Sequence, residues 1–341
     1  MTTKPIVITL GDPAGIGPEI IAKAFRDAPE LLRGCFVAGD LGSLRRATRV
    51  VAGGDAPALP VGLIDSPAEA WAIAPRCIPL LQVVVPPESF DIGAISAVAG
   101  RVAGDSVVWA ARAALRGEVR AIVTAPLHKE SLAAAGFAYP GHTELLQAES
   151  AAHLGRPVVQ MPVRMMLANH ELRTVLVSIH MSLRDAIAAV TFDSVLQTLR
   201  IAHEALSRAL GRPPRLAVAG LNPHAGEGGL FGSEEREVIG PAIAAACAEG
   251  IDARGPFAPD TVFMRARGFS EFDGVVAMYH DQGLIPVKYL GVEQGVNVTL
   301  GLPLVRTSPD HGTAFDIAGT GRADAASLLE AIRVAKSLAG D

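Results

Sequence analysis

The stretch Asp273–Lys288 reads DGVVAMYHDQGLIPVK and decides the fold. Its first half is a short apolar run rich in valine, which is typical of a buried β-strand. His280 and Asp281 follow that strand directly, and we expect the turn Gly283–Pro286 to carry Lys288 into the same neighbourhood. In open α/β sheets ligands bind outside the carboxyl ends of the strands. The stretch therefore predicts a functional loop at a strand end of an α/β protein.

Two further histidines occupy the same setting. His180 closes one apolar run, and His224 follows another in the glycine-rich loop LNPHAGEGG. A lone histidine is more often structural than a ligand, but neutral imidazole is the commonest transition-metal ligand and three protein ligands leave a position for substrate. The three strand-end histidines, His180, His224 and His280, predict one metal site. Asp260 and Asp281 are either direct ligands or groups that fix the ring tautomers.

Composition limits the class of protein. The chain has 341 residues, 19% of them charged, and a net charge of −5. This length predicts two lobes with a cleft between them, and the charge gives no argument for nucleic acid. No apolar run reaches the ~20 residues of a membrane helix and no signal peptide opens the chain, so we expect a cytoplasmic protein. Cys35, Cys77 and Cys247 are isolated and predict buried thiols, not disulfides or a metal site.

The amino-terminal region predicts a strand, a glycine turn and a helix. Pro5–Leu10 reads PIVITL, Gly11–Glu19 reads GDPAGIGPE, and a helical pattern covers Ile20–Arg26. The glycines allow a ligand to approach the backbone near the positive end of a helix, although a tight turn without a ligand needs the same glycines. The spacing is not GxGxxG, so no Rossmann fingerprint is present. Strands and helices continue to alternate, which favours a parallel sheet.

A second candidate anion site lies in the loop Tyr139–Thr143, which reads YPGHT. A helix is expected to start near Glu144, so His142 and Thr143 lie at its amino end. That position suits an anionic group of a ligand. Capping of the helix by Thr143 alone is the alternative.

The loop Asp310–Ala323 reads DHGTAFDIAGTGRA. It resembles the HGxAxDIAGxGxA adenosine-binding loop of the β-decarboxylating dehydrogenases, the isocitrate and isopropylmalate dehydrogenase family. GDPAGIGPE likewise resembles that family's GDGIGPE. The resemblance implies an α/β fold of two α/β/α lobes with a cleft between them, isopropylmalate dehydrogenase-like and not Rossmann. Residues 1–126 and 305–341 are expected to form the dinucleotide-side lobe, and residues 127–304 the lobe for metal, substrate and dimerisation.

Within that superfamily, Ile6–Ala335 resembles the 4-hydroxythreonine-4-phosphate dehydrogenases of the pyridoxal phosphate pathway. The matching stretches include TAPLHKESL, YPGHTELL, GLNPHAGEGGLFGSEE, GPFAPDT and GVNVTLGLPLVRTSPDHGTAFDIAG. The resemblance implies NAD or NADP as cofactor and one divalent metal per site. It also implies a homodimer in which the neighbouring subunit completes each site and supplies some of the metal ligands.

The candidate site residues fall into four roles. The metal ligands are His180, His224 and His280; the substrate contacts are His142, Thr143, Lys288, Asn297 and Arg306; the cofactor contacts are Gly11, Asp12, Gly15, Gly17, His311, Gly312, Ala314 and Asp316. Lys288 or Asp281 moves the proton, and the sequence does not choose between them. Arg306 and Lys288 are natural partners for phosphate.

The implied reaction is the oxidation of 4-phosphohydroxy-L-threonine to a β-keto acid, which decarboxylates to 3-amino-2-oxopropyl phosphate. A metal would assist both steps as a Lewis acid, and zinc, cobalt, magnesium and manganese stay open. One alternative is a related dehydrogenase for threonate or erythronate 4-phosphate, or for an aromatic dihydrodiol. An alternative of another class is a phosphate acyltransferase, which needs neither dinucleotide nor metal.

Overall fold

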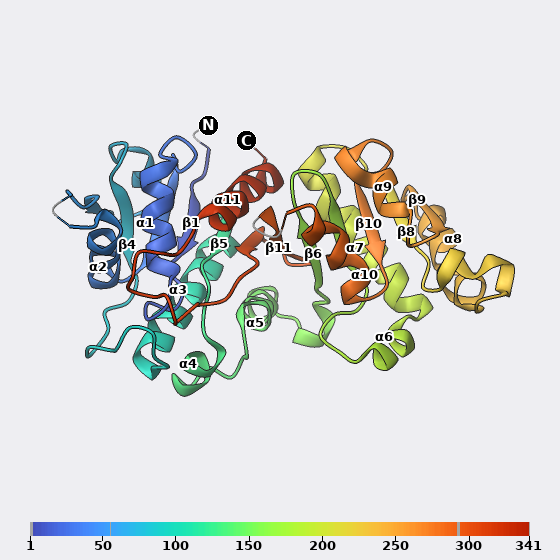
Figure 1. Cartoon of the computed structure of the whole chain (residues 1–341), viewed down its shortest axis with the longest axis horizontal. Helices are drawn as coiled ribbons and strands as arrows, with labels where there is room; N and C mark the ends of the chain where they lie inside the picture. The colour runs from blue at the N-terminus through green and yellow to red at the C-terminus, as the bar shows by residue number, and fades with distance from the viewer. Residues whose placement is uncertain (1–2, 55, 292–293, 341) are drawn as a thin grey trace. The chain divides into compact units, whose positions relative to one another are not determined.

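The structure is a computed structural model that describes residues 3–54, 56–291 and 294–340. The chain divides into two compact units: one holds the chain up to Met161 together with Leu302–Ala339, and the other holds Pro162–Gly301 (Figure 1). Residues 127–161 belong to the first unit, whereas the sequence prediction assigned them to the second lobe. The roles of the two lobes stay predictions.

The first unit is built on six parallel strands in the order β3-β4-β2-β1-β5-β12. Its strands and helices are β1 (Ile6–Thr9), α1 (Gly17–Asp27), β2 (Cys35–Gly39), α2 (Leu41–Ala52), β3 (Val61–Leu63), β4 (Ile78–Gln82), α3 (Ala97–Leu115), β5 (Ala121–Thr124), α4 (Lys129–Ala134), α5 (His142–Leu154), β12 (Arg306–Pro309) and α11 (Ala326–Ala339). The predicted parallel sheet is confirmed for this unit.

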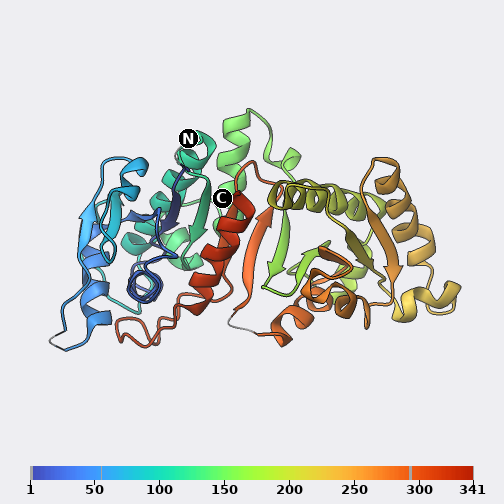
Figure 2. The same ribbon diagram turned by 90° about the horizontal axis from the view of Figure 1, so that it is seen from above.

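Helices cover both faces of this sheet, which is why its central strands are buried along their whole length and mostly apolar. All residues of β1, β2 and β5 are buried. Helices α1, α2 and α11 pack together, as do α3, α4 and α5, and Figure 2 shows the two groups on opposite sides of the strands. Ser96 begins α3 by accepting the backbone N–H of Ala99 at 3.3 Å. The unit is therefore a three-layered α/β/α body.

The second unit also has six strands, in the order β11-β6-β7-β10-β8-β9. Its elements are β6 (Arg164–Ala168), β7 (Arg173–Leu176), α6 (Leu183–Ala189), α7 (Phe192–Leu210), β8 (Leu216–Ala219), α8 (Gly240–Ala248), β9 (Ala253–Phe257), α9 (Val262–Ala266), β10 (Gly274–Ala277), α10 (His280–Tyr289) and β11 (Val296–Leu300). Strand β6 is antiparallel to both neighbours, so the prediction of a parallel sheet is wrong at this strand. The reason is a tight turn in which Asn169 Oδ1 accepts the N–H groups of Glu171 and Leu172, both at 2.8 Å.

Helix α10 corrects a second prediction. The expected turn at Gly283–Pro286 lies inside this helix. Leu284 and Val287 are buried in the core of the second unit, and that packing outweighs the tendency of Pro286 to end a helix. Gly283 permits the close approach, because a Cβ there would lie 2.4 Å from Leu176 Cδ2. The same sequence therefore forms a helix packed against β7 and β10.

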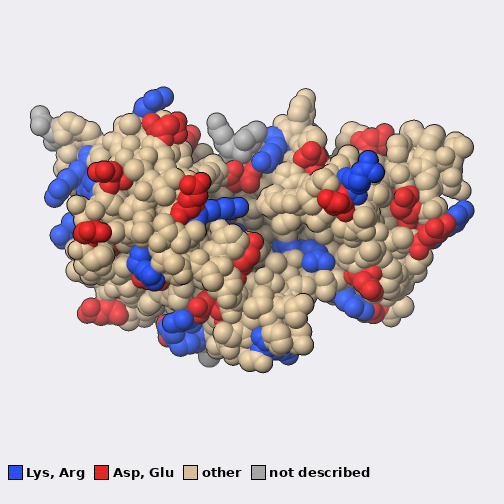
Figure 3. Space-filling view, turned by 90° about the horizontal axis from the view of Figure 1, so that it is seen from below, with Lys and Arg blue, Asp and Glu red and all other residues tan. Residues whose placement is uncertain are grey.

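Surface features agree in part with the sequence analysis. On the face in Figure 3, basic and acidic side chains are interspersed without an extended patch of one sign. No helix among the described residues is long and apolar enough to cross a membrane. Cys35 is buried and Cys77 half-buried, but Cys247 is exposed, which corrects the expectation of three buried thiols.

Candidate functional site

In the second unit, four loops leave the same edge of the sheet. Strands β7, β10, β8 and β9 are adjacent and parallel, so their carboxyl ends lie side by side. The side chains that follow these ends in the chain are His180, His280, His224 and Asp260. The predicted strand-end placement of the three histidines is confirmed, and Asp260 shares it.

Two of the three histidines come together. The ring centroids of His180 and His280 are 5.7 Å apart. His280 Nδ1 lies 2.8 Å from Asp281 Oδ1, a contact that is a hydrogen bond when Nδ1 carries the proton, and in that tautomer Nε2 is the atom that could bind a metal. Within residues 3–54, 56–291 and 294–340, no three His, Cys, Asp or Glu side chains are close enough to hold a metal ion. The donor chemistry fits a divalent metal, but one chain brings only two of the rings together.

The third histidine lies in a loop of unusual backbone geometry. Five consecutive residues, His224–Gly228, have left-handed φ values between 42° and 77°. Each non-glycine residue in this conformation costs roughly 1–2 kcal/mol, and such strain persists only where surrounding contacts impose it. The contacts come from Glu235, whose Oε1 accepts the N–H groups of Leu221 and Asn222 at 2.7 Å each. His224 is therefore held in a defined place.

The Glu235 carboxylate is itself adapted to this role. It is 6% exposed, and burial alone would raise its pKa. The hydrogen bonds from Asn222 and Leu221 outweigh burial and lower the pKa, so the group is ionised at neutral pH. Sequence reasoning missed Glu235, because it lies fourteen residues beyond Leu221 in the adjoining helical segment.

The other predicted residues of the second unit are more dispersed. Lys288 lies in the last turn of α10, about 12 Å from His280 along the axis of that helix, because each residue adds roughly 1.5 Å. The predicted turn is therefore replaced by helix, and a shared site for Lys288 and His280 stays a prediction. Asn297 is on β11, opposite Leu167, and is the partly exposed residue of a strand that is otherwise buried.

In the first unit, a buried cation lies beside a helix amino end. Arg306 is 4% exposed, and its Nε and Nη2 donate to Thr124 Oγ1 at 3.1 and 2.7 Å. Burial lowers the pKa of Arg306 to about 10, against the raising effect of Glu144. His142 and Thr143 are the first residues of α5, so the predicted helix begins two residues before Glu144.

His142 is tuned to stay neutral. Burial, and then the positive charge of Arg306, hold its pKa well below the ordinary 6.5. Its Nε2 is inaccessible to solvent and has no hydrogen-bond partner among the described residues. A helix amino end, a buried guanidinium and an unused imidazole nitrogen together suit a phosphate group.

The two glycine-rich motifs meet in the first unit. Ile16 N donates to Thr313 O at 3.0 Å, and the Glu19 carboxylate accepts the N–H groups of Gly319 and Gly321. These residues are about 300 positions apart in sequence, and they meet because β1, β5 and β12 are neighbours. The two motifs that resemble the dehydrogenase family are therefore in direct contact.

The glycines of these motifs differ in what they contact. A Cβ on Gly11 would lie 2.4 Å from Pro126 O, one on Gly15 2.8 Å from Thr313 O, and one on Gly17 2.6 Å from Leu10 O. Those three glycines make room for the protein's own backbone. This agrees with the alternative stated for this motif, in which the turn needs its glycines without a ligand. A Cβ on Gly312 would meet nothing within 4 Å. Gly312 is the glycine of the predicted set whose surroundings are open to a ligand.

The remaining predicted cofactor residues lie around Gly312. His311 Nδ1 is 3.1 Å from Gly312 O, Ala314 has a left-handed φ of 41°, and Asp316 lies two residues further on. Asp12 is fully buried, and its Oδ1 accepts Ala14 N at 2.9 Å. Burial raises the pKa of Asp12, and that hydrogen bond opposes the rise.

His128 is a residue that sequence reasoning missed. Its ring stacks on Phe315, with centroids 4.8 Å apart and an interplanar angle of 19°. His128 Nδ1 and Asp12 Oδ2 are both buried without a hydrogen-bond partner among the described residues. The available signal was its position directly after β5, the same strand-end argument that identified the other histidines.

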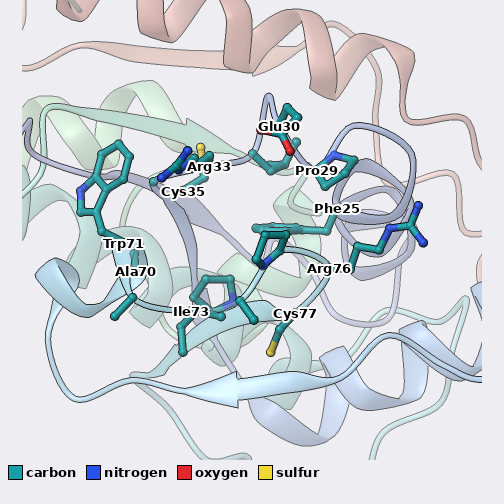
Figure 4. Close-up of a pocket in the computed structure, with 16 residues that line it drawn as sticks. Phe25, Pro29, Glu30, Arg33, Cys35, Ala70, Trp71, Ile73, Arg76 and Cys77 are labelled. Carbon is teal, nitrogen blue, oxygen red and sulfur yellow. The ribbon is translucent and has the colours of Figure 1, made fainter.

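A pocket of about 340 Å³ lies elsewhere in the first unit. Figure 4 shows Trp71, Phe25, Arg33 and Arg76 around it, with Cys35 and Cys77 also lining it. Burial raises the pKa of the Cys35 thiol to about 11. None of the predicted site residues lines this pocket, so it is separate from the candidate chemistry.

Comparison with known proteins identifies relatives over nearly the whole chain. The family model described as pyridoxal phosphate biosynthetic protein PdxA matches residues 32–335. A 4-hydroxythreonine-4-phosphate dehydrogenase of Beijerinckia indica is 52% identical, covering 99% of this chain and 96% of its own. A D-threonate 4-phosphate dehydrogenase of Salmonella typhimurium is 45% identical, covering 99% of this chain and 100% of its own.

A solved structure supports the same relationship. The 4-hydroxythreonine-4-phosphate dehydrogenase of Klebsiella pneumoniae superposes with a TM-score of 0.88 at 42% identity, covering 99% of this chain and 100% of that one. The predicted α/β fold and the predicted oxidoreductase class are thereby confirmed. The chain belongs to the family of the pyridoxal phosphate biosynthetic protein PdxA.

Proposed function

We propose that this protein oxidises 4-phosphohydroxy-L-threonine with NAD or NADP, forming a β-keto acid that loses carbon dioxide to give 3-amino-2-oxopropyl phosphate. The observation that carries the proposal is the 52% identity over 99% of the chain to a relative of that named activity. In the balanced reaction the secondary alcohol gives a hydride to the nicotinamide and a proton to a base. The bond between the carboxylate and its neighbouring carbon then breaks, carbon dioxide leaves, and the electron pair forms an enolate that takes up a proton to give the ketone.

The metal ligands in this proposal are His180, His224 and His280. Their strand-end positions, the adjacent rings of His180 and His280, and the fixed loop of His224 support the assignment. Asp281 would set the tautomer of His280, and the exposed Asp260 would lie around the same ion. A divalent metal bound there supplies Lewis acidity, which lowers the pKa of an alcohol and withdraws electrons from a ketone. Zinc, cobalt, magnesium and manganese all suit such a donor set.

The phosphate of the substrate would bind to Arg306, His142 and Thr143. Arg306 offers a rigid, buried guanidinium, and α5 offers the unbonded N–H groups of its first turn. Neutral His142 adds a hydrogen bond without a second positive charge. Lys288 and Asn297 are proposed as further substrate contacts from the second unit.

The proton acceptor is Asp281 or Lys288, and the two have different surroundings. Asp281 is engaged with His280, whereas Lys288 lies at the far end of α10. Loss of the base lowers kcat at neutral pH and shifts its pH profile, while loss of an orienting group chiefly weakens metal binding. Comparing Asp281→Asn with Lys288→Gln on both measures assigns the role.

The dinucleotide would bind at the paired loops of the first unit. His311, Gly312, Ala314, Asp316 and Asp12 stay the proposed contacts, and the open space at Gly312 supports a close backbone approach there. Gly11, Gly15 and Gly17 would act indirectly, by shaping the loop on which the cofactor rests. Whether NAD or NADP is preferred follows from comparing kcat/KM for the two.

We further propose a homodimer whose subunits complete one another's metal site. The arrangement follows from the resemblance to this family, which implies that the neighbouring subunit supplies some of the metal ligands. A dimer also suits the general rule that soluble oligomers are symmetric and mostly twofold.

D-threonate 4-phosphate is the second candidate substrate, because a relative of that named activity is 45% identical over 99% of this chain. The test is NADH formation by the purified protein with each substrate, with and without a chelator. The proposal expects the higher kcat/KM with 4-phosphohydroxy-L-threonine and loss of the rate on chelation. A preference for threonate phosphate overturns the substrate, and an unchanged rate with chelator overturns the metal role.

A further inference from the structure

A continuous set of side-chain hydrogen bonds links the three strand ends that lead to the histidines. It centres on the peptide groups of Met278, a fully buried residue two positions before His280. The Met278 N–H donates to Gln282 Oε1 at 2.7 Å, and the Met278 carbonyl accepts from Ser178 Oγ at 2.9 Å. Gln282 Nε2 then donates to Gly220 O at 2.7 Å.

Two of these bonds join the ends of neighbouring strands, and the bond between Met278 and Gln282 connects them. Ser178 lies two residues before His180 and connects the end of β7 to that of β10. Gln282 connects the end of β10 to that of β8, whose chain continues to His224. The next two residues after Gly220 are Leu221 and Asn222. Their backbone N–H groups donate to the Glu235 carboxylate.

The bonds lie where the backbone ladder has ended. The last register pairs are Ala277 with Leu176 and Val276 with Val218. Beyond them the chains diverge from the sheet toward the histidines. Side chains that bond here therefore act at the points where the loops leave the sheet.

The Gln282 amide is suited to this position by its chemistry. It must accept from an N–H and donate to a carbonyl at the same time, which only an amide side chain of this length does. Reversing the amide would oppose like groups at both contacts. The proximity of Gln282 to His280, two residues away in the first turn of α10, makes it part of the same local structure.

We infer that Gln282 and Ser178 are positioning residues for the proposed metal ligands: through the Met278 peptide groups they fix where the His180, His224 and His280 loops of each subunit leave its sheet, whichever subunit's metal each histidine reaches. This inference rests on the proposed metal role of the three histidines. Groups that orient metal ligands from behind typically affect metal affinity by roughly 10–100-fold when removed.

The test is Co²⁺ binding by the full-length, metal-free protein, measured by titration calorimetry and by the visible d–d absorption spectrum. Gln282→Met keeps the length of the side chain and removes both hydrogen bonds, and Ser178→Ala removes the third. We expect each variant to bind Co²⁺ about 10–100-fold more weakly, with a changed spectrum that reports altered coordination geometry. Gln282→Glu keeps the acceptor for the Met278 N–H but loses the donor to Gly220 O. We expect its Co²⁺ affinity to fall by a similar factor.

Two matched controls separate positioning from general damage. Gln197→Met removes a glutamine acceptor that bonds Arg164, in the same unit but away from the strand ends. Ser106→Ala removes a buried hydroxyl that donates to Val102 O at 2.7 Å. Both should bind Co²⁺ as the wild type does, and thermal unfolding of each metal-free variant checks that its fold is intact.

The outcomes are distinguishable. Wild-type affinity and spectrum in folded Gln282→Met and Ser178→Ala would overturn the positioning role while leaving the metal site in place. If Gln282→Met fails to fold, Ser178→Ala and Gln282→Glu decide the question by the same two measurements. If the wild type itself binds no Co²⁺, the proposed metal role fails, and the positioning inference fails with it.

Discussion

Arg306 is the residue on which the proposed recognition of a phosphorylated substrate chiefly depends. Its guanidinium is buried and directed by two hydrogen bonds to Thr124, so its fork is already oriented before a ligand arrives. Lysine keeps the charge but lacks the planar fork. We predict that Arg306→Lys raises KM for the phosphorylated substrate roughly 10–100-fold, since one charge-assisted hydrogen bond is worth about 1.5–3 kcal/mol.

The matched control for that measurement is Arg333→Lys. Arg333 pairs with Glu330 on the exposed side of α11, so the same substitution there should leave KM unchanged. Equal KM values for wild type and Arg306→Lys would argue that phosphate binds elsewhere.

His142 gives a prediction on pH. Its folded-state pKa lies well below 6.5, because of burial and then the charge of Arg306. The unfolded chain therefore binds a proton that the folded one does not, so stability is full above pH ~6.5 and falls as the pH drops below that value. We predict that His142→Asn, which has no ring to titrate, shows a smaller loss of stability than the wild type on going from pH ~7.5 to ~5.5.

The measurement is urea unfolding of both proteins at the two pH values. An exposed histidine provides the comparison: His170→Asn should retain the wild-type slope, since His170 is exposed on the surface of the second unit. A slope in His142→Asn as steep as that of the wild type would mean that other groups cause the loss.

At the scale of single elements, helix α10 depends on one glycine. Alanine at a helical glycine normally stabilises by about 1 kcal/mol. At Gly283, however, the added methyl would lie 2.4 Å from Leu176 Cδ2 and 3.0 Å from Ala277 Cβ. Overpacking of this kind costs roughly 1–3 kcal/mol. We therefore predict that Gly283→Ala lowers the free energy of unfolding by about 1–2 kcal/mol, measured by urea denaturation.

Ile285→Ala tests whether that loss reflects packing. Ile285 is in the same helix and 64% exposed, so its truncation should change the stability by less than ~0.5 kcal/mol. If Gly283→Ala instead stabilises the protein, Leu176 can move aside and the contact does not limit the helix.

The elements that the sequence predicted correctly are those whose own residues determine them. The strand predicted at Pro5–Leu10 and the helix predicted at Ile20–Arg26 are observed as β1 and α1, because their local apolar patterns are sufficient to determine them. Helix α10 could not be predicted, because Pro286 is locally a helix breaker and only the burial of Leu284 and Val287 overrides it. Tertiary packing, which no local window contains, decides such cases.

The candidate site divides in the same way. The strand-end positions of His180, His224 and His280 followed from the apolar runs that precede them in the sequence. The role of the Glu235 carboxylate and the stacking of His128 on Phe315 could not be predicted in this way. Both depend on contacts with residues outside the local stretch of sequence. The sequence also could not show that Gly11 makes room for Pro126, not for a ligand.

At the scale of the whole molecule, the question is which chain supplies each metal ligand. His180 and His280 lie together, while the described residues of one chain hold no three-ligand group. If His224 reaches the metal from the other subunit of a twofold dimer, each site combines residues of both chains. The variants His224→Ala and His280→Ala should then each be inactive as homodimers.

A dimer with one chain of each variant, purified through two different affinity tags, tests this directly. One of its sites would keep His280 from one chain and His224 from the other, so about half of the wild-type activity per dimer should return. The mirror experiment pairs a wild-type chain with a His224→Ala/His280→Ala chain. Shared sites would leave both of its sites broken, whereas sites built within one chain would leave half of the activity. The two heterodimers therefore give opposite results under the two arrangements, and an inactive first dimer beside a half-active second would exclude the shared site.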